Sequence, residues 1–164
     1  MPYRVCFVCS GNICRSPTAE AVLCRQLAEA GLAGQVEVDS AGLGDWHVGE
    51  GADRRSASVL RRRGYPERPH RARQFRASDF AHRDLVVALD CGHERSLRAL
   101  APTAADRDKV RLLRSYDPAA AAAGDREPDV PDPYYGGPDG FEHVLDLVEA
   151  ACRGLLTEVR AQLG

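Results

Sequence analysis

Short apolar segments alternate with longer amphipathic ones along this chain. Continuous apolar runs at 5–8 and 85–89 predict strands that are covered on both faces, and two further strands are predicted at 36–38 and 110–113. Because predicted strands and helices alternate, we expect an α/β fold: a single domain with a four-stranded parallel sheet flanked by helices.

Apolar residues at helical spacing predict the helices. The first helix begins next to Ser16, a suitable N-cap, has Pro17 at its first position and is stopped by Gly31. Later amphipathic segments predict helices at 54–63, just before Pro102, and at 141–159.

Composition limits the classes of protein that this chain can belong to. The 164 residues are 44% hydrophobic and 28% charged, with a net charge of −2, so we expect one domain over residues 1–164. No apolar run reaches the ~20 residues of a transmembrane helix and no charged leader opens the chain, which predicts a cytoplasmic protein without a membrane partner. Export without a leader is the alternative to a cytoplasmic location. The near-neutral charge argues against a nucleic-acid partner, and we expect a monomer or a weak homodimer.

Charge is distributed unevenly along the chain. Segment 54–76 carries nine arginines, whereas segment 125–149 is strongly acidic. Solvated faces are the simpler interpretation of both runs. The alternative is a basic rim that steers anionic partners toward the protein.

The segment between the first predicted strand and the first predicted helix holds the candidate site. A cysteine ends the strand and an arginine follows six residues later, in the run Cys9-Ser10-Gly11-Asn12-Ile13-Cys14-Arg15-Ser16. A tight loop that enters a helix directs backbone N–H groups and the positive end of the helix dipole at one point. Arg15 adds a guanidinium fork that matches two phosphate oxygens, and Gly11 and Asn12 tolerate the left-handed backbone of a curled loop. This pattern predicts an oxyanion site.

The same electrostatic field favours the thiolate form of Cys9, which is the nucleophilic form. We expect Ser16 to cap the helix through an oxygen lone pair while its hydroxyl donates a proton to the Cys9 sulfur. A thiolate beside a phosphate site can attack phosphorus.

An attack of this kind also requires an acid. A phenolate that leaves phosphorus needs a proton, and a carboxylic acid on the opposite side of the site is the usual donor. Asp132 is the best candidate, because Pro133 holds it extended and aromatic residues follow. Asp117 and Asp129 are the alternatives. All three carboxyl groups lie in a predicted long loop, 116–140, which is rich in proline, glycine and acidic residues.

The run that begins at Cys9 resembles the signature of the low-molecular-weight protein tyrosine phosphatases, and above all that of actinobacterial members. Other segments resemble further parts of the family, in the same order and spacing over nearly the whole chain. They are Ser40-Ala41-Gly42, Asp45-Trp46-His47-Val48-Gly49, His70-Arg71-Ala72-Arg73-Gln74 and Asp132-Pro133-Tyr134-Tyr135-Gly136. The resemblance implies a flavodoxin-like, Rossmannoid architecture.

The activity that the resemblance implies is hydrolysis of protein phosphotyrosine and small aryl phosphates through a phosphocysteine. Cys9 would be the nucleophile, Arg15 the phosphate clamp and Asp132 the general acid and base. Substrate contacts are implied for Ser10, Gly11, Asn12, Ile13, Cys14, Trp46, Tyr134 and Tyr135, and support of the loop for Ser16, Ser40 and His70. No metal or cofactor is implied. The implied partners are tyrosine-phosphorylated proteins and, in the site itself, oxyanions such as phosphate or vanadate.

Two of these implied roles have simpler alternatives. Asn12, Ser40 and His70 fit a set that fixes the loop by hydrogen bonds, and buried polar groups that merely satisfy one another would look alike. Cys14 resembles a redox partner that forms a reversible disulfide with Cys9, and a structural loop residue is nearly as good an interpretation.

Other functional classes fit the sequence less well. A zinc site built on Cys6 and Cys9 fails, because residues three apart on a strand face opposite sides and no second ligand pair follows. A nucleotide-binding loop lacks its Gly-x4-Gly-Lys-Ser/Thr pattern. Arsenate reductase is the runner-up: it uses a similar loop but needs two further cysteines on a nearby helix, where only Cys91 occurs. The intact catalytic set argues against a silent phosphotyrosine-binding module.

Overall fold

The structure, a computed structural model, describes residues 1–122, 124, 128–134 and 136–164. The strands are β1 (Tyr3–Cys9), β2 (Val36–Gly42), β3 (Leu85–Ala88) and β4 (Val110–Leu112). The α-helices are α1 (Arg15–Glu29), α2 (Arg54–Arg62), α3 (Cys91–Leu100), α4 (Ala104–Asp108), α5 (Pro118–Ala122) and α6 (Pro138–Leu163). Two short 3₁₀ helices are η1 (Ala77–His82) and η2 (Leu113–Tyr116).

The four strands form one parallel sheet in the order β2-β1-β3-β4. In this register Cys9 lies opposite Gly42 of β2, and Val8 lies opposite Ala88 of β3. The predicted four-stranded parallel sheet is confirmed. The second strand runs four residues further than the predicted 36–38, because β1 pairs with it as far as Gly42.

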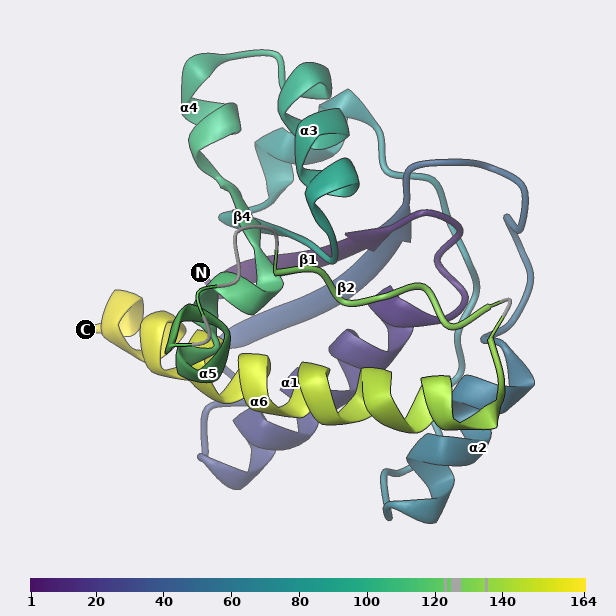
Figure 1. The fold of residues 1–164 in the computed structure, drawn as a ribbon. Helices are drawn as coiled ribbons and strands as arrows, with labels where there is room; N and C mark the ends of the chain where they lie inside the picture. Colours follow the sequence, from purple (N-terminus) through teal and green to yellow (C-terminus); the bar gives the residue numbers. More distant parts are fainter. Residues whose placement is uncertain (123, 125–127, 135) are drawn as a thin grey trace.

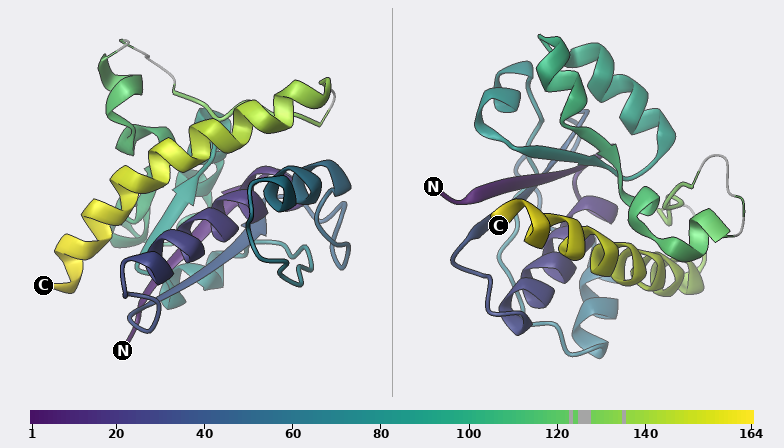
Figure 2. Two further views of the ribbon diagram at one scale, coloured as in Figure 1. Left: turned by 90° about the horizontal axis from the view of Figure 1, so that it is seen from below. Right: turned by 90° about the vertical axis from the view of Figure 1, so that its left-hand side faces the viewer.

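Helices cover both faces of the sheet (Figures 1 and 2). One face carries α1, α2 and α6, and the other carries α3 with α4 and η1. Alternate residues of β1 serve the two cores: Val5 and Phe7 pack toward α1 and α6, while Cys6 and Val8 pack toward α3. Because Cys9 shares the first core, Cys6 and Cys9 face opposite sides of the sheet, as the alternation of a strand predicts.

The predicted cap of the first helix is wrong. Helix α1 begins at Arg15, its N-cap is Cys14, and no side chain bonds to the free N–H groups there. Ser16 is already inside the helix, where other groups engage its hydroxyl. Pro17 is the third helical residue and is tolerated because the first-turn N–H groups have no partner within the helix.

The predicted long loop at 116–140 is partly helical, which corrects that prediction. Asp117 Oδ1 accepts a hydrogen bond from Ala119 N at 2.9 Å, and the alanines that follow form the short helix α5. A capping aspartate before a run of the best helix-forming residue explains the turn. Position 123, the last of that alanine run, lies outside the described residues. Helix α6 begins at Pro138, three residues before the predicted start.

The carboxyl ends of β1 and β3 lie at the point where the strand order reverses. The connection from β1 crosses to β2 on one side, and the later strands add on the other. Open parallel sheets bind ligands at such a point. Both chain termini lie at the other end of the molecule (Figure 1). Among the described helices, none is long and apolar enough to cross a membrane.

Candidate active site

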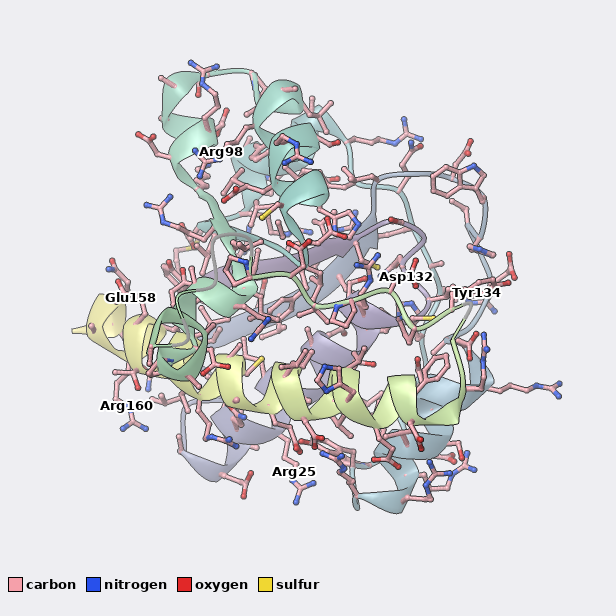
Figure 3. All side chains as sticks on the ribbon, viewed as in Figure 1. Arg25, Arg98, Asp132, Tyr134, Glu158 and Arg160 are labelled. Carbon is pink, nitrogen blue, oxygen red and sulfur yellow. The ribbon has the colours of Figure 1, made fainter. Side chains whose placement is uncertain are left out.

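A cleft of about 320 Å³ opens at the carboxyl end of β1. Its lining comes from three segments of the sequence: Cys9, Ser10, Gly11, Ile13, Cys14, Arg15, Trp46, His47, Asp132 and Tyr134. Figure 3 shows Asp132 and Tyr134 on the segment that leads into α6, beside the turn between β1 and α1. That turn, residues 9–15, is called the phosphate loop below. The structure thus brings together the loop, the aromatic residues and the carboxylate that were predicted from separate motifs.

Cys9 ends β1, and only 3% of its surface is exposed. Its Sγ lies 2.9 Å from Ser16 Oγ, which accepts a hydrogen bond from Asn12 Nδ2 at 2.8 Å. Among the described residues the other acceptor near this hydroxyl is Ala41 O, at the longer distance of 3.4 Å, so the sulfur is the nearer acceptor for the Ser16 proton. A thiolate at Cys9 would gain a charge-assisted hydrogen bond from this arrangement.

Asn12 is buried and has a left-handed backbone, with φ at 60°. Its side-chain amide donates to Ser40 Oγ at 2.9 Å and accepts from Arg73 N at 3.0 Å. Its backbone carbonyl accepts from His70 Nε2 at 2.7 Å. Ser40 Oγ then donates to Glu20 Oε1 at 2.7 Å. These bonds hold the loop in a conformation that costs a non-glycine residue free energy. Asn12 is not among the residues that line the cleft, and its predicted contact with substrate stays a prediction.

Gly11 does not have the left-handed backbone that was predicted for it. A Cβ atom at Gly11 would instead lie 2.8 Å from His47 Cδ2, so the close approach of the next loop favours glycine. Gly42 has a stricter requirement, because a Cβ atom there would lie 2.8 Å from the backbone oxygen of Ser10. The phosphate loop is therefore seated directly on the end of β2.

Arg15 is the first residue of α1, and its side chain is 4% exposed. Nη1 donates to Asp90 Oδ2 at 2.8 Å and to Val130 O at 3.0 Å, while Nη2 lies 3.7 Å from Asp132 Oδ2. Burial opposes ionisation of Asp90, but the backbone hydrogen bond from His93 and the charge of Arg15 together hold its pKa below the usual value. A fixed carboxylate thus orients the guanidinium fork.

His93, in the first turn of α3, is also buried against the phosphate loop. Its Nε2 lies 2.9 Å from Ser10 Oγ and 3.5 Å from Arg15 Nη2, and its Nδ1 lies 3.2 Å from Asp90 Oδ1. Since the guanidinium only donates, Nε2 is an acceptor and the ring carries its proton on Nδ1. Burial, and then repulsion by Arg15, lower the pKa of His93 to about 4, so the ring is neutral at pH 7.

Asp132 is the one of the three candidate acids that lines the cleft. Its side chain is half exposed, and its Oδ1 accepts a hydrogen bond from Tyr134 N at 3.0 Å. The other two carboxyl groups have structural partners: Asp117 caps α5, and Asp129 Oδ1 accepts from Cys91 N at 2.8 Å.

Aromatic side chains form the outer rim of the cleft. Trp46 is 69% exposed, and its ring folds over Gly44, where a Cβ atom would lie 2.1 Å from the indole. The His47 ring, which the prediction did not include, lies 6.4 Å from the Tyr134 ring, centroid to centroid. Tyr135 lies outside the described residues, so its predicted contact is not placed.

Within the described part of the chain, the backbone N–H groups of residues 11–14 have no protein acceptor. An oxyanion above Cys9 could receive them. The family model for low molecular weight phosphotyrosine protein phosphatase matches residues 4–163. The chain belongs to this phosphatase family. The predicted resemblance is confirmed.

Relatives of known name agree with that assignment. The chain is 63% identical to a low molecular weight protein-tyrosine-phosphatase of Streptomyces coelicolor, over 99% of this chain and 97% of the relative. A protein tyrosine phosphatase from Entamoeba histolytica, solved with Hepes in its active site, superimposes with a TM-score of 0.90 at 33% identity and covers 99% of each chain. The Drosophila arginine phosphatase superimposes with a TM-score of 0.83 at 32% identity, over 94% of this chain and 96% of the other.

Cys14 lines the phosphatase cleft together with Cys9, and both are free thiols. Burial, and then the charge of Asp53, raise the pKa of Cys14 to about 12. The Cys14 thiol is therefore neutral at pH 7. Its redox role stays a prediction. No group of three or more His, Cys, Asp or Glu residues in the described ranges is placed to hold a metal ion.

Sequence reasoning missed Asp90, His93 and His47 as residues of the phosphatase site. Asp90 directly follows the predicted strand 85–89, and the carboxyl end of a parallel strand is where ligands bind, so its position was a usable signal. His93 contacts the loop only because α3 begins there. His47 lies within a segment that resembles the family, yet no local pattern indicates its role.

Proposed function

We propose that this phosphatase hydrolyses phosphotyrosine by in-line attack of Cys9 on phosphorus. The observation that carries the proposal is the meeting of three groups in one cleft: the Cys9 sulfur with a hydroxyl donor at 2.9 Å, the buried Arg15 fork and the Asp132 carboxyl. A nucleophile, an oxyanion clamp and a proton donor are what cleavage of an aryl phosphate requires.

In the first step the Cys9 thiolate forms the S–P bond as the bond between phosphorus and the phenolic oxygen breaks. Asp132 enters this step protonated and donates its proton to the leaving oxygen, which departs as a neutral tyrosine hydroxyl. Arg15 and the loop N–H groups hold the three equatorial oxygens. Their hydrogen bonds strengthen as the transferring group becomes planar, which selectively stabilises the transition state.

In the second step water attacks phosphorus and the S–P bond breaks. The Asp132 carboxylate, left by the first step, takes a proton from that water, and Cys9 leaves as the thiolate. Ser16 stabilises this leaving sulfur through the hydrogen bond that it offers in the resting site. Inorganic phosphate is released, and both catalytic groups return to their starting states.

The rim supports tyrosine as the phosphorylated residue. Because one structural relative is named an arginine phosphatase, the shared fold alone does not decide this point. Trp46, His47 and Tyr134 surround the mouth of the cleft with flat apolar surface, which suits a phenyl ring. A phosphoserine side chain is shorter and offers the rim no aromatic face, so we expect it to be a poorer substrate.

The test compares free phosphotyrosine, phosphoserine, phosphoarginine and arsenate as substrates, in the presence of a thiol reductant. Each is assayed with the wild-type protein and with Cys9→Ser. We expect turnover of phosphotyrosine above all others, inhibition by vanadate and loss of turnover in the variant. Arsenate reduction without phosphatase activity would favour the runner-up enzyme. Preference for phosphoarginine would overturn the argument from the rim.

The assignment of the acid has its own test. Asp132→Ala should lower kcat/KM for phosphotyrosine by about 10²-fold or more, because a poorly acidic phenol needs the proton. For an aryl phosphate whose leaving group is a strongly acidic nitrophenol, kcat/KM should fall much less. The matched control is Asp129→Ala. Equal losses on both esters would assign the proton donor elsewhere.

A further inference from the structure

Arg55, the second residue of α2, lies outside the cleft lining but is tied to the phosphate loop. Its Nε and Nη2 donate to the two carboxylate oxygens of Asp53 at 3.1 and 3.0 Å. Asp53 in turn donates its backbone N–H to Ile13 O at 2.8 Å. One intervening residue therefore connects this guanidinium to the loop that holds the phosphate.

The other side of Arg55 contacts the segment that carries Asp132. Nη1 donates to Tyr134 O at 3.1 Å, and the guanidinium carbon lies 5.3 Å from the Tyr134 ring centroid. It also lies 4.6 Å from the centroid of the Phe141 ring, in the first turn of α6. Arginine is suited to this place, because its planar group can stack on rings while its edge makes hydrogen bonds.

Tyr134 is also the residue that orients the proposed acid. Its backbone N–H donates to Asp132 Oδ1, whereas its carbonyl accepts from Arg55. The two backbone polar groups of one residue thus connect the carboxylate on one side with the guanidinium on the other. A displacement of Tyr134 would move Asp132 relative to the phosphate loop.

We propose that Arg55 is a positioning residue for the general acid. It holds Tyr134, and through Tyr134 the carboxyl of Asp132, at a fixed place above the phosphate loop. This inference rests on the proposed role of Asp132 as proton donor. It predicts that Arg55 matters in proportion to how much the leaving group needs a proton, although Arg55 itself touches neither substrate nor reacting atoms.

The experiment compares Arg55→Ala and Arg55→Lys with the neighbouring control Arg54→Ala. Arg54 is exposed and has no ion pair within the described residues. For Arg55→Ala we expect kcat/KM for phosphotyrosine to fall about tenfold and that for a nitrophenyl ester of strongly acidic phenol to change less than about twofold. For Arg55→Lys, kcat/KM for phosphotyrosine should lie between the values of wild type and Arg55→Ala, because lysine keeps the charge but lacks the planar fork. Arg54→Ala should change neither value.

The ratio of the two esters, measured on one preparation, does not depend on how much of a variant is folded. Equal losses on both esters would overturn the proposal. The double variant gives a second test. If Arg55 acts through Asp132, adding Arg55→Ala to Asp132→Ala should not lower kcat/KM for phosphotyrosine further, because there is no carboxyl left to position. A further fall of the full Arg55→Ala size would also overturn the proposal.

The same measurements separate this inference from the proposed function. If Asp132→Ala slows both esters equally, the acid has been assigned wrongly and both proposals fall. If Asp132→Ala slows phosphotyrosine hydrolysis more than nitrophenyl ester hydrolysis, and Arg55→Ala slows both equally, Asp132 remains the acid. Only the positioning role of Arg55 is then rejected.

Discussion

Single atoms in this site often serve two partners at once. Ser16 Oγ accepts from Asn12 and faces the Cys9 sulfur, while His93 Nε2 faces both Ser10 Oγ and Arg15. Such shared contacts fix rotamers before substrate arrives, so little reorganisation remains for the reaction itself. They also fix protonation, because a group that must accept from a guanidinium cannot itself be charged.

His93 should make the folded protein sensitive to acid. The pKa of His93 is about 4 in the folded protein and 6.5 in the absence of perturbation. As the pH falls, the unfolded chain therefore takes up the proton at a higher pH than the folded protein does. The free energy of unfolding decreases as the pH drops from about 6.5 to about 4. Between pH 7 and pH 5 this amounts to roughly 2 kcal/mol. In denaturant titrations His93→Asn should lose less stability over that interval than wild type or His82→Asn, a control at an exposed histidine. Identical losses in all three would contradict the assigned environment.

At the scale of elements, an ionic contact joins α2 to α6. Arg63, just after α2, pairs with Glu142 at 2.8 Å, with Asp146 at 2.7 Å and with Glu149 at 2.7 Å. The Tyr65 hydroxyl donates to the same Glu149. Asp53, the N-cap of α2, contacts the phosphate loop, and α6 begins just after the segment that carries Tyr134. The ionic contact between α2 and α6 therefore helps to fix the two sides of the cleft relative to each other.

Arg63→Ala should therefore destabilise the fold by roughly 2 kcal/mol, as expected when one partner of a half-buried ionic network is removed. Arg61→Ala is the control: within the described residues Arg61 pairs only with the exposed Glu67, so this substitution should cost less than about 0.5 kcal/mol. Urea unfolding gives both values. A cost for Arg63→Ala no larger than that of the control would show that the network contributes nothing.

The elements were predictable where apolar periodicity was strong. The runs at 5–8 and 85–89 became buried strands, and the spacing at 141–159 became the middle of α6. The cap at Ser16 was not predictable, because tertiary contacts with Asn12 and Cys9 engage its hydroxyl. The site could be predicted where one short motif carries it. His93 contacts the site, and Arg55 connects to it, only through packing between distant elements, which leaves no local pattern. Asp90 could have been found from its place directly after a predicted strand.

For the whole molecule, the structure argues against a free basic rim at 54–76. Six of its nine arginines form ion pairs with acidic side chains of the described chain, including those of α6. The positive run and the acidic run at 125–149 thus partly neutralise each other in the fold. The remaining arginines of the segment, Arg54, Arg71 and Arg76, are exposed.

This neutralisation predicts weak long-range steering of acidic substrates. Between about 0.05 and 0.5 M sodium chloride, kcat/KM for an acidic phosphotyrosine peptide should change less than about threefold, because screening removes only a small attraction. A neutral phosphotyrosine peptide serves as the control. A steep fall for the acidic peptide alone would restore the docking surface that the sequence suggested.

The central claim is that Cys9 carries the phosphoryl group between the two steps. Mixing enzyme with a nitrophenyl phosphate, quenching with acid during turnover and mapping the adduct by mass spectrometry tests it most directly. Asp132→Ala should accumulate the adduct, because the second step lacks its base. We predict a phosphoryl group on the peptide that contains Cys9, absent from Cys9→Ser, which should also be inactive. Turnover that survives in Cys9→Ser, or a phosphoryl group on any other residue, would contradict the account.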